Sequence, residues 1–217
     1  MKKREFLKAV GWVGATLTVR EGASALIKCR HESAKVVALN GSPDEHGNTA
    51  YALSVMGGVF ERERIDFEII NMGGKDIRGC IACNSCHLDN KGKGCLYATP
   101  DEQKWINSMK TANAIILASP TCFGGIAGTL KSFLDRAFFS GSENFRYKAG
   151  AAVVTTLRSG ASMTFESLNQ YFTIAEMPVA SSTYWNNIHG LTPDDLKQDA
   201  EGIRTLQNLA KNIIRMI

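Results

Sequence analysis

Four cysteines in one segment are the residues whose types and spacing point most directly to chemistry. Cys80, Cys83 and Cys86 are separated by two residues each, and Cys95 follows after eight more. This spacing places three thiols on one tight turn and a fourth on the same loop, and a cubane iron–sulfur cluster needs one such soft ligand for each iron. The same thiols could instead hold zinc, with His87 as a further ligand, form disulfides in an oxidising compartment, or remain free.

A second polar group follows an apolar segment that ends near residue 40. Residues 40–49 read Asn-Gly-Ser-Pro-Asp-Glu-His-Gly-Asn-Thr and lead into a segment with helical apolar spacing. The hydroxyls of Ser42 and Thr49, the amide of Asn48 and the N–H groups of a helix start are donors that suit a phosphate. No Lys follows Gly47 and no G-x-G-x-x-G is present, which excludes the triphosphate P-loop and the dinucleotide fingerprint. A single terminal phosphate remains, and a polar turn that caps a helix has the same composition.

Two further loops are rich in small residues and could bind a flat ring. Residues 119–125 read Ser-Pro-Thr-Cys-Phe-Gly-Gly, and residues 155–161 read Thr-Thr-Leu-Arg-Ser-Gly-Ala. Both loops offer bare backbone N–H and C=O groups, and the first adds an aromatic edge. A flat heteroaromatic ligand requires these features. Three such loops at equivalent positions are stronger evidence than any one of them.

The elements that must position these loops alternate between short apolar segments and amphipathic helices. Such alternation predicts one α/β domain over residues 34–217, a doubly wound parallel sheet with helices on both faces and ligands beyond the carboxyl ends of the strands. Capping boxes at 99–102 and 192–195 predict the starts of two helices. Residues 72–100 form the one long connection without periodicity, a cysteine-rich insert loop, and a loop of that length in a compact domain is usually functional. The predicted strands are residues 35–40, 65–71, 114–119, 149–156 and 179–185.

The N-terminal segment differs from the rest of the chain in charge. Residues 1–25 contain five Lys or Arg against two Glu, so they carry most of the net charge of +4. The remainder is nearly neutral, and we therefore expect no nucleic-acid partner. The uncharged stretch Ala9–Val19 is too short to span a bilayer but suits the apolar region of an export signal.

The residues before that stretch favour an export signal. Residues 3–8 read Lys-Arg-Glu-Phe-Leu-Lys and resemble the twin-arginine motif, with Lys in place of the first Arg. We expect a leader over residues 1–30 that is cleaved near Ala25, export to the periplasm, and no membrane span. The alternative is an amphipathic N-terminal helix on a cytoplasmic protein.

The first two ligand loops carry a family resemblance. Asn-Gly-Ser-Pro with Gly-Asn-Thr (40–49), and Ser-Pro-Thr-Cys-Phe-Gly-Gly with Leu-Lys-Ser-Phe-Leu-Asp-Arg (119–136), resemble the flavodoxin-like NADPH-dependent FMN reductase superfamily. With the clustered cysteines included, the chain is similar to the iron–sulfur flavoprotein branch over most of residues 34–215. The resemblance implies a flavodoxin-like five-stranded sheet with strand order 2-1-3-4-5 and FMN bound at its edge.

The resemblance also implies a role for each loop. The loop after the first strand would hold the FMN phosphate, the loop after the third would line the flavin ring, and the loop after the fourth would follow the edge of the ring. The family usually has a bulkier residue where Cys122 stands, so we expect this cysteine to act as a small apolar filler. The residues implied for FMN are Ser42, Pro43, Gly47, Asn48, Thr49, Pro120, Thr121, Cys122, Phe123, Gly124, Thr156, Ser159 and Gly160, and those implied for a 4Fe–4S cluster are Cys80, Cys83, Cys86 and Cys95.

The function that the resemblance implies is FMN-dependent oxidoreduction. NAD(P)H is the expected reductant, a redox protein such as a ferredoxin the expected partner, and a homodimer or tetramer the expected assembly. The flavin carries the chemistry, so we name no catalytic side chain. Two alternatives are a non-enzymatic electron carrier of the flavodoxin type, which is typically acidic, and a zinc-binding module with a vestigial flavin site. Export would separate the protein from NAD(P)H, and a redox protein or a quinone pool would then be the donor.

Overall fold

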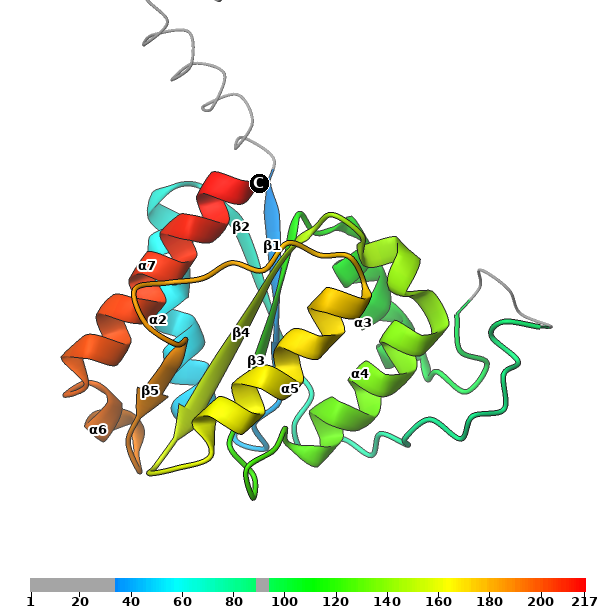
Figure 1. Cartoon of the computed structure of the whole chain (residues 1–217), viewed down its shortest axis with the longest axis horizontal. Coiled ribbons are helices and arrows are strands. Elements are labelled where there is room, and N and C mark those ends of the chain that lie inside the picture. The colour runs from blue at the N-terminus through cyan, green and yellow to red at the C-terminus, as the bar shows by residue number, and fades with distance from the viewer. Residues whose placement is uncertain (1–33, 89–93) are drawn as a thin grey trace, which may run out of the picture. The chain divides into compact units, whose positions relative to one another are not determined.

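The parallel sheet predicted from the alternating pattern is present (Figure 1). The computed structural model describes residues 34–88 and 94–217, and the predicted leader (1–30) with its cleavage site near Ala25 lies outside the described residues. The sheet is five-stranded and parallel in the order β2-β1-β3-β4-β5, as the resemblance implies. In chain order the elements are β1 (Lys35–Asn40), α2 (Asn48–Arg62), β2 (Asp66–Asn71), α3 (Pro100–Thr111), β3 (Ala114–Pro120), α4 (Gly128–Gly141), the 3-10 helix η2 (Ser142–Phe145), β4 (Ala149–Thr156), α5 (Ala161–Ile174), β5 (Asn187–His189), α6 (Pro193–Leu196) and α7 (Ala200–Met216).

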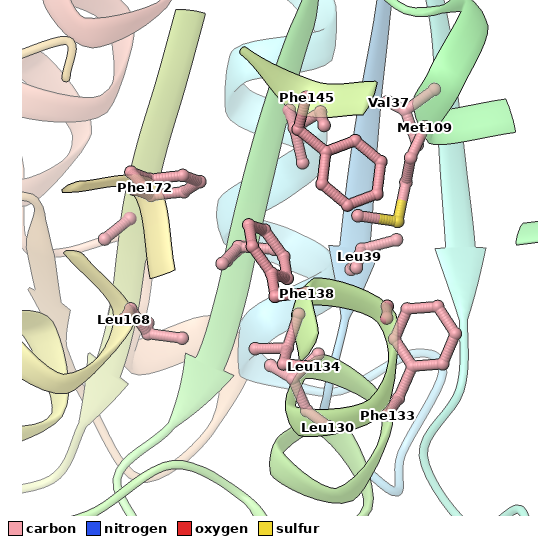
Figure 2. Close-up of a cluster of buried hydrophobic side chains, with 14 of the residues drawn as sticks. Val37, Leu39, Met109, Leu130, Phe133, Leu134, Phe138, Phe145, Leu168 and Phe172 are labelled. Atoms are coloured by element: carbon pink, nitrogen blue, oxygen red, sulfur yellow. The ribbon is translucent and has the colours of Figure 1, made fainter. Parts of the chain in front are cut away.

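The central strands are apolar throughout because both of their faces are covered by helices. All eight residues of β4 are buried, and so are five of the six in β1. Alternate side chains enter two cores, because successive residues of a strand point to opposite faces. One core joins the sheet to α3, α4 and α5, and the other joins it to α2 and α7 (Figure 1). Figure 2 shows phenylalanine and leucine side chains of α4 and α5 in the first core, together with Val37 and Leu39 of β1.

The position of the fifth strand was predicted wrongly. β5 comprises residues 187–189 and pairs with the end of β4, whereas residues 179–185 form only an isolated bridge to β4 through Val179. Trp185 and most of its neighbours are exposed, while Ile188 is the buried residue of β5. Apart from Ala180, the apolar residues that indicated a strand therefore lie at the surface, and the true edge strand is too short to show a period.

The helix starts follow the predicted capping boxes, with one difference near the C-terminus. Thr99 and Thr192 both make the boxes that the sequence indicates. The helix that Thr192 begins ends at Leu196, and α7 starts after Asp199, whose carboxylate accepts the backbone N–H of Gly202 at 2.9 Å. Two helices therefore follow the capping box at 192–195, because Asp199 provides a further N-cap. In residues 34–88 and 94–217, none of the helices has the length and apolar character needed to cross a bilayer.

The contact between β4 and α5 should be sensitive to one added methyl group. A Cβ at Gly150 of β4 would lie 2.5 Å from the ring of Phe172, which is fully buried. Neither the strand nor the ring can move freely in a close-packed core. We therefore expect Gly150→Ala to lower the free energy of unfolding by about 1–3 kcal/mol, measured by chemical denaturation followed by circular dichroism.

Gly128→Ala is the matched control for this substitution. Gly128 begins α4, and a Cβ there would meet no atom within 4 Å. Alanine favours a helix over glycine, so the control should leave the free energy of unfolding unchanged or raise it by up to about 1 kcal/mol. Equal losses in the two variants would contradict the close packing assigned to Gly150 and Phe172.

Candidate functional site

The loops that follow β1, β3, β4 and β5 meet around one cavity at the carboxyl edge of the sheet. Its volume is about 550 Å³, within the usual range of small-molecule and cofactor sites. Most of the residues predicted to bind FMN line this cavity. They are Ser42, Pro43, Gly47, Asn48, Thr49, Pro120, Thr121, Cys122 and Thr156.

The loop after β1 leaves hydrogen-bond donors free at the start of α2. Gly47 is the N-cap, and no side chain in the described part of the chain caps this helix. The first N–H groups of a helix have no partner within it, so those of α2 remain available to an anion at the positive end of the helix dipole. The hydroxyl of Ser42 accepts the N–H of Asp44 at 3.2 Å and keeps its own proton to donate. This end of the cavity fits a phosphate.

Two side chains predicted to hold the phosphate make contacts within the protein. Nδ2 of Asn48 donates to the carbonyls of Gly190 and Leu191, at 3.0 and 3.2 Å. The hydroxyl of Thr49 lies 3.0 Å from that of Thr155, where either can be the donor. These contacts join the start of α2 to the loop after β5 and to the end of β4. The structure therefore gives Asn48 and Thr49 a role in fixing the walls of the cavity.

The loop after β5 is a wall that the sequence analysis missed. Residues 190–193 line the cavity beside the loop after β1. This loop was not predicted because the fifth strand was placed at residues 179–185. A local signal was present, because Gly190 precedes the capping box at Thr192 much as Gly47 precedes α2. A Cβ at Gly190 would lie 2.4 Å from a side-chain carbon of Leu196, so a larger residue would displace the loop. The other lining residues that were not predicted are Asp44, Thr155 and Leu157.

The loops after β3 and β4 are packed directly against one another. Gly160 has φ +85°, and a Cβ there would lie 3.0 Å from Cα of Gly124 and from a methyl group of Thr121. The hydroxyl of Thr164 lies 3.2 Å from the carbonyl of Gly125, and this contact holds α5 to the loop after β3. Gly124 and Gly160 therefore allow the loops after β3 and β4 to pack together. Phe123, Gly124, Ser159 and Gly160, all predicted to contact FMN, lie outside the lining of the cavity, and the Phe123 side chain is fully exposed.

The helix starts divide into two groups. The helices that follow the loops after β1, β3 and β4, which are α2, α4 and α5, have no side-chain cap within the described residues. The other three, α3, α6 and α7, are capped by Thr99, Thr192 and Asp199. Caps stabilise helix starts, and the uncapped start of α2 lines the cavity, so its donors are available to a ligand there, whereas α6, which also begins at this edge, is capped by Thr192.

The four clustered cysteines line a second, smaller cavity beside α4. Its volume is about 20 Å³, room for about one water molecule. Among residues 34–88 and 94–217, no three His, Cys, Asp or Glu side chains are arranged to hold a metal ion. His87, the further zinc ligand considered above, packs edge-on against Phe139 of α4. The thiols of Cys80, Cys83, Cys86 and Cys95 are thus gathered, and a cluster would require them to come closer together.

The turn between these cysteines directs hydrogen-bond donors at sulfur. Ala82 has φ +53°, and its N–H donates to Sγ of Cys80 at 3.5 Å. Hydrogen bonds from the backbone and hydroxyl of Ser85 lower the pKa of the Cys83 thiol, whereas burial raises the pKa of Cys86. N–H donors to sulfur accompany iron–sulfur clusters in proteins, so the donor set fits a soft-metal cluster in its chemistry.

Comparison with known proteins agrees with this arrangement. The family model for NADPH-dependent FMN reductases matches residues 34–190. An iron–sulfur flavoprotein of Methanocaldococcus jannaschii is 30% identical over 191 residues, which cover 84% of this chain and 97% of that protein. An iron–sulfur flavoprotein of Archaeoglobus fulgidus is 28% identical over 204 residues, covering 84% of this chain and 94% of that protein.

A solved structure shows the same fold at lower sequence identity. The flavodoxin, WrbA-like protein from Agrobacterium tumefaciens has a TM-score of 0.60 and 14% identity, covering 84% of this chain and 96% of that one. The match to the family model spans the loops after β1, β3 and β4 and the cysteine segment. These findings support a flavin oxidoreductase or electron carrier. The chain belongs to the NADPH-dependent FMN reductase family and, within it, to the iron–sulfur flavoproteins.

Proposed function

We propose that this protein binds FMN at the carboxyl edge of the sheet and acts as an NAD(P)H-dependent oxidoreductase. The observation that carries the proposal is the uncapped start of α2 at a cavity of about 550 Å³, whose lining loops match the FMN reductase family. Bound FMN would supply hydride and single-electron transfer, which protein side chains do not provide.

The protein's own part at the phosphate end is to bind an anion with neutral donors. The hydroxyl of Ser42 and the N–H groups at the start of α2 are the donors offered there. Of the described residues that line the cavity, none is Lys, Arg or His. The helix dipole and the hydrogen bonds would therefore balance the phosphate charge.

At the ring end, the backbone is held in place by its own hydrogen bonds. Cys122 and Gly125 exchange two backbone hydrogen bonds, at 3.0 and 2.9 Å, and the N–H of Thr121 donates to the carbonyl of Thr155 at 2.9 Å. The loop is thus fixed before a ligand arrives, which lowers the entropy lost on binding. Asp44 and Cys122 are the titratable side chains among the lining residues, and we assign neither an acid or base role.

We further propose that Cys80, Cys83, Cys86 and Cys95 hold a 4Fe–4S cluster. Support comes from the shared cavity of the four thiols, the N–H donors directed at sulfur, and the similarity to iron–sulfur flavoproteins. A bound cluster would supply single-electron transfer to a protein partner such as a ferredoxin.

Removal of the Ser42 hydroxyl should weaken binding of FMN through its phosphate. A hydrogen bond to a charged group contributes about 1.5–3 kcal/mol, so we expect Ser42→Ala to bind FMN about 10–100-fold more weakly. Riboflavin lacks the phosphate and should bind the variant and the wild type equally. Titration of deflavinated protein with each ligand, followed by flavin fluorescence, measures both affinities.

Ser54→Ala is the matched control, because Ser54 lies on α2 and its hydroxyl donates to the carbonyl of Tyr51 at 2.7 Å. It should bind both ligands as the wild type does. An equal loss of FMN and riboflavin affinity in Ser42→Ala would show that Ser42 does not contact the phosphate.

Steady-state turnover distinguishes the reductase from an electron carrier. We expect the full-length, FMN-loaded protein to oxidise NADH or NADPH with a quinone or free FMN as acceptor, at about 1 per second or faster, because typical enzymes lie in that range. Nucleotide oxidation is followed by absorbance, with deflavinated protein as the control. A protein that neither nucleotide reduces, but that exchanges electrons with a redox protein, would instead be a carrier of the flavodoxin type.

Metal analysis tests the cluster. Anaerobically purified full-length protein should contain about four iron and four sulfide per chain, with broad visible absorbance beyond that of the flavin. Cys83→Ser should lose most of the iron and keep its FMN, because the two sites have separate linings. Cys29→Ser, outside the cysteine segment, is the control and should keep both. Zinc without iron, or disulfides between these cysteines in the native protein, would overturn the assignment.

A further inference from the structure

Arg136 is a buried cation that the proposed function leaves unexplained. It lies on α4, is 5% exposed, and its Nη2 is buried without a hydrogen-bond partner in the described residues. Its Nη1 lies 2.7 Å from a carboxylate oxygen of Glu102, which is 2% exposed. Removing two charges from water is unfavourable, and an unpaired donor adds to that cost. Fold stability alone therefore does not account for a charged pair at this place.

The pair connects both ends of the cysteine segment to α4. Nη1 of Arg136 also donates to the carbonyl of Arg78, 3.1 Å away and two residues before Cys80. The second carboxylate oxygen of Glu102 accepts the N–H of Thr99 at 2.6 Å, four residues after the last cysteine. The described residues between these anchors contain no helix or strand. One buried ion pair thus holds the chain just before Cys80 and at the start of α3.

Arg136 also shares the cavity of the four thiols. It lines that cavity, and it lines the adjoining space beside Cys95 and Glu102. The other cation at the thiol cavity is Arg78, whose exposed guanidinium lies 5.8 Å from the centre of the Tyr97 ring. The Arg136 charge is screened less, because it is buried. Glu102 balances this charge at 2.7 Å, but Arg136 and not Glu102 lines the thiol cavity, so the thiols meet the positive end of the buried pair.

We propose that Arg136 is a positioning residue, which holds the cysteine segment for the iron–sulfur cluster and places the positive end of its buried ion pair beside the thiolates. This inference rests on the cluster proposed above. A cluster held by four thiolates is an anion, and its reduced form carries one more negative charge. A nearby buried cation therefore stabilises the bound cluster, and stabilises the reduced form more than the oxidised form.

Variants of Arg136 separate its geometry from its charge. In full-length protein purified anaerobically, Arg136→Gln should keep its FMN, lose iron to a chelator about 10–100-fold faster, and have a lower cluster potential in a titration monitored by electron paramagnetic resonance. Arg136→Lys should have a cluster potential close to that of the wild type, because lysine keeps the charge. It should still lose iron to the chelator almost as fast as Arg136→Gln, because lysine lacks the planar fork of arginine. Arg146→Gln is the control, because Arg146 pairs with Glu176 at the surface, and both readouts should match the wild type.

Hydrogen exchange on cluster-free protein tests the anchoring without a metal. After chelation, amides of residues 78–88 and 94–99 should exchange faster in Arg136→Gln than in the wild type, while those of β1 and β3 should not change. Where Arg136→Gln fails to fold, the double variant Arg136→Met with Glu102→Leu removes both buried charges and should still lose the cluster faster.

The outcomes for the cluster and for Arg136 are distinguishable. If the wild-type protein contains no iron, the proposal of a cluster fails. Equal hydrogen exchange in the cluster-free wild type and Arg136→Gln would then overturn the anchoring as well. Iron-loaded Arg136→Gln with unchanged retention, potential and exchange would overturn the role of Arg136 while leaving the proposed function intact.

Discussion

All strands of this sheet run in parallel, so their carboxyl ends, and the backbone groups that follow them, meet at one edge. Hydrogen-bonding groups at such an edge must find partners in side-chain caps, neighbouring loops or a ligand. Thr99, Thr192 and Asp199 cap helices α3, α6 and α7, whereas α2, α4 and α5 begin without such caps. The candidate flavin site is therefore mainly a product of topology and backbone, and its side chains chiefly hold the loops in place.

The close approach of these loops explains why glycine recurs around the cavity. A Cβ at Gly73, just after β2, would lie 1.7 Å from the carbonyl oxygen of Ser42. The loop after β2 therefore supports the loop after β1 from behind. Asn48, at the end of the same loop, donates to the carbonyls of residues 190 and 191. A site held by several such contacts is organised before its ligand binds.

What the sequence could reveal depends on how local each signal is. The strands at 35–40, 114–119 and 149–156 are buried on both faces, so their apolar composition identified them. Edge strand β5 has three residues and one buried side chain, too few to show a period. Because this strand was not predicted, the cavity wall at 190–193 that follows it was not predicted either. The partners of Asn48 lie more than 140 residues away, and Glu102 was read only as part of a capping box although it also pairs with Arg136. Contacts of that kind are set by the folded topology and leave no local pattern.

The two candidate sites differ in how much of their geometry the fold provides. Loops at the sheet edge are fixed by hydrogen bonds to one another, whereas the described part of the cysteine segment has no sheet or helix to fix it. Metal binding to such a segment is coupled to its ordering, so part of the binding free energy is used to draw the ligands together. Anchors at the carbonyl of Arg78 and at Thr99 shorten the stretch that must be ordered. A buried ion pair that adds little to stability would then be retained because it makes the proposed cluster site easier to form.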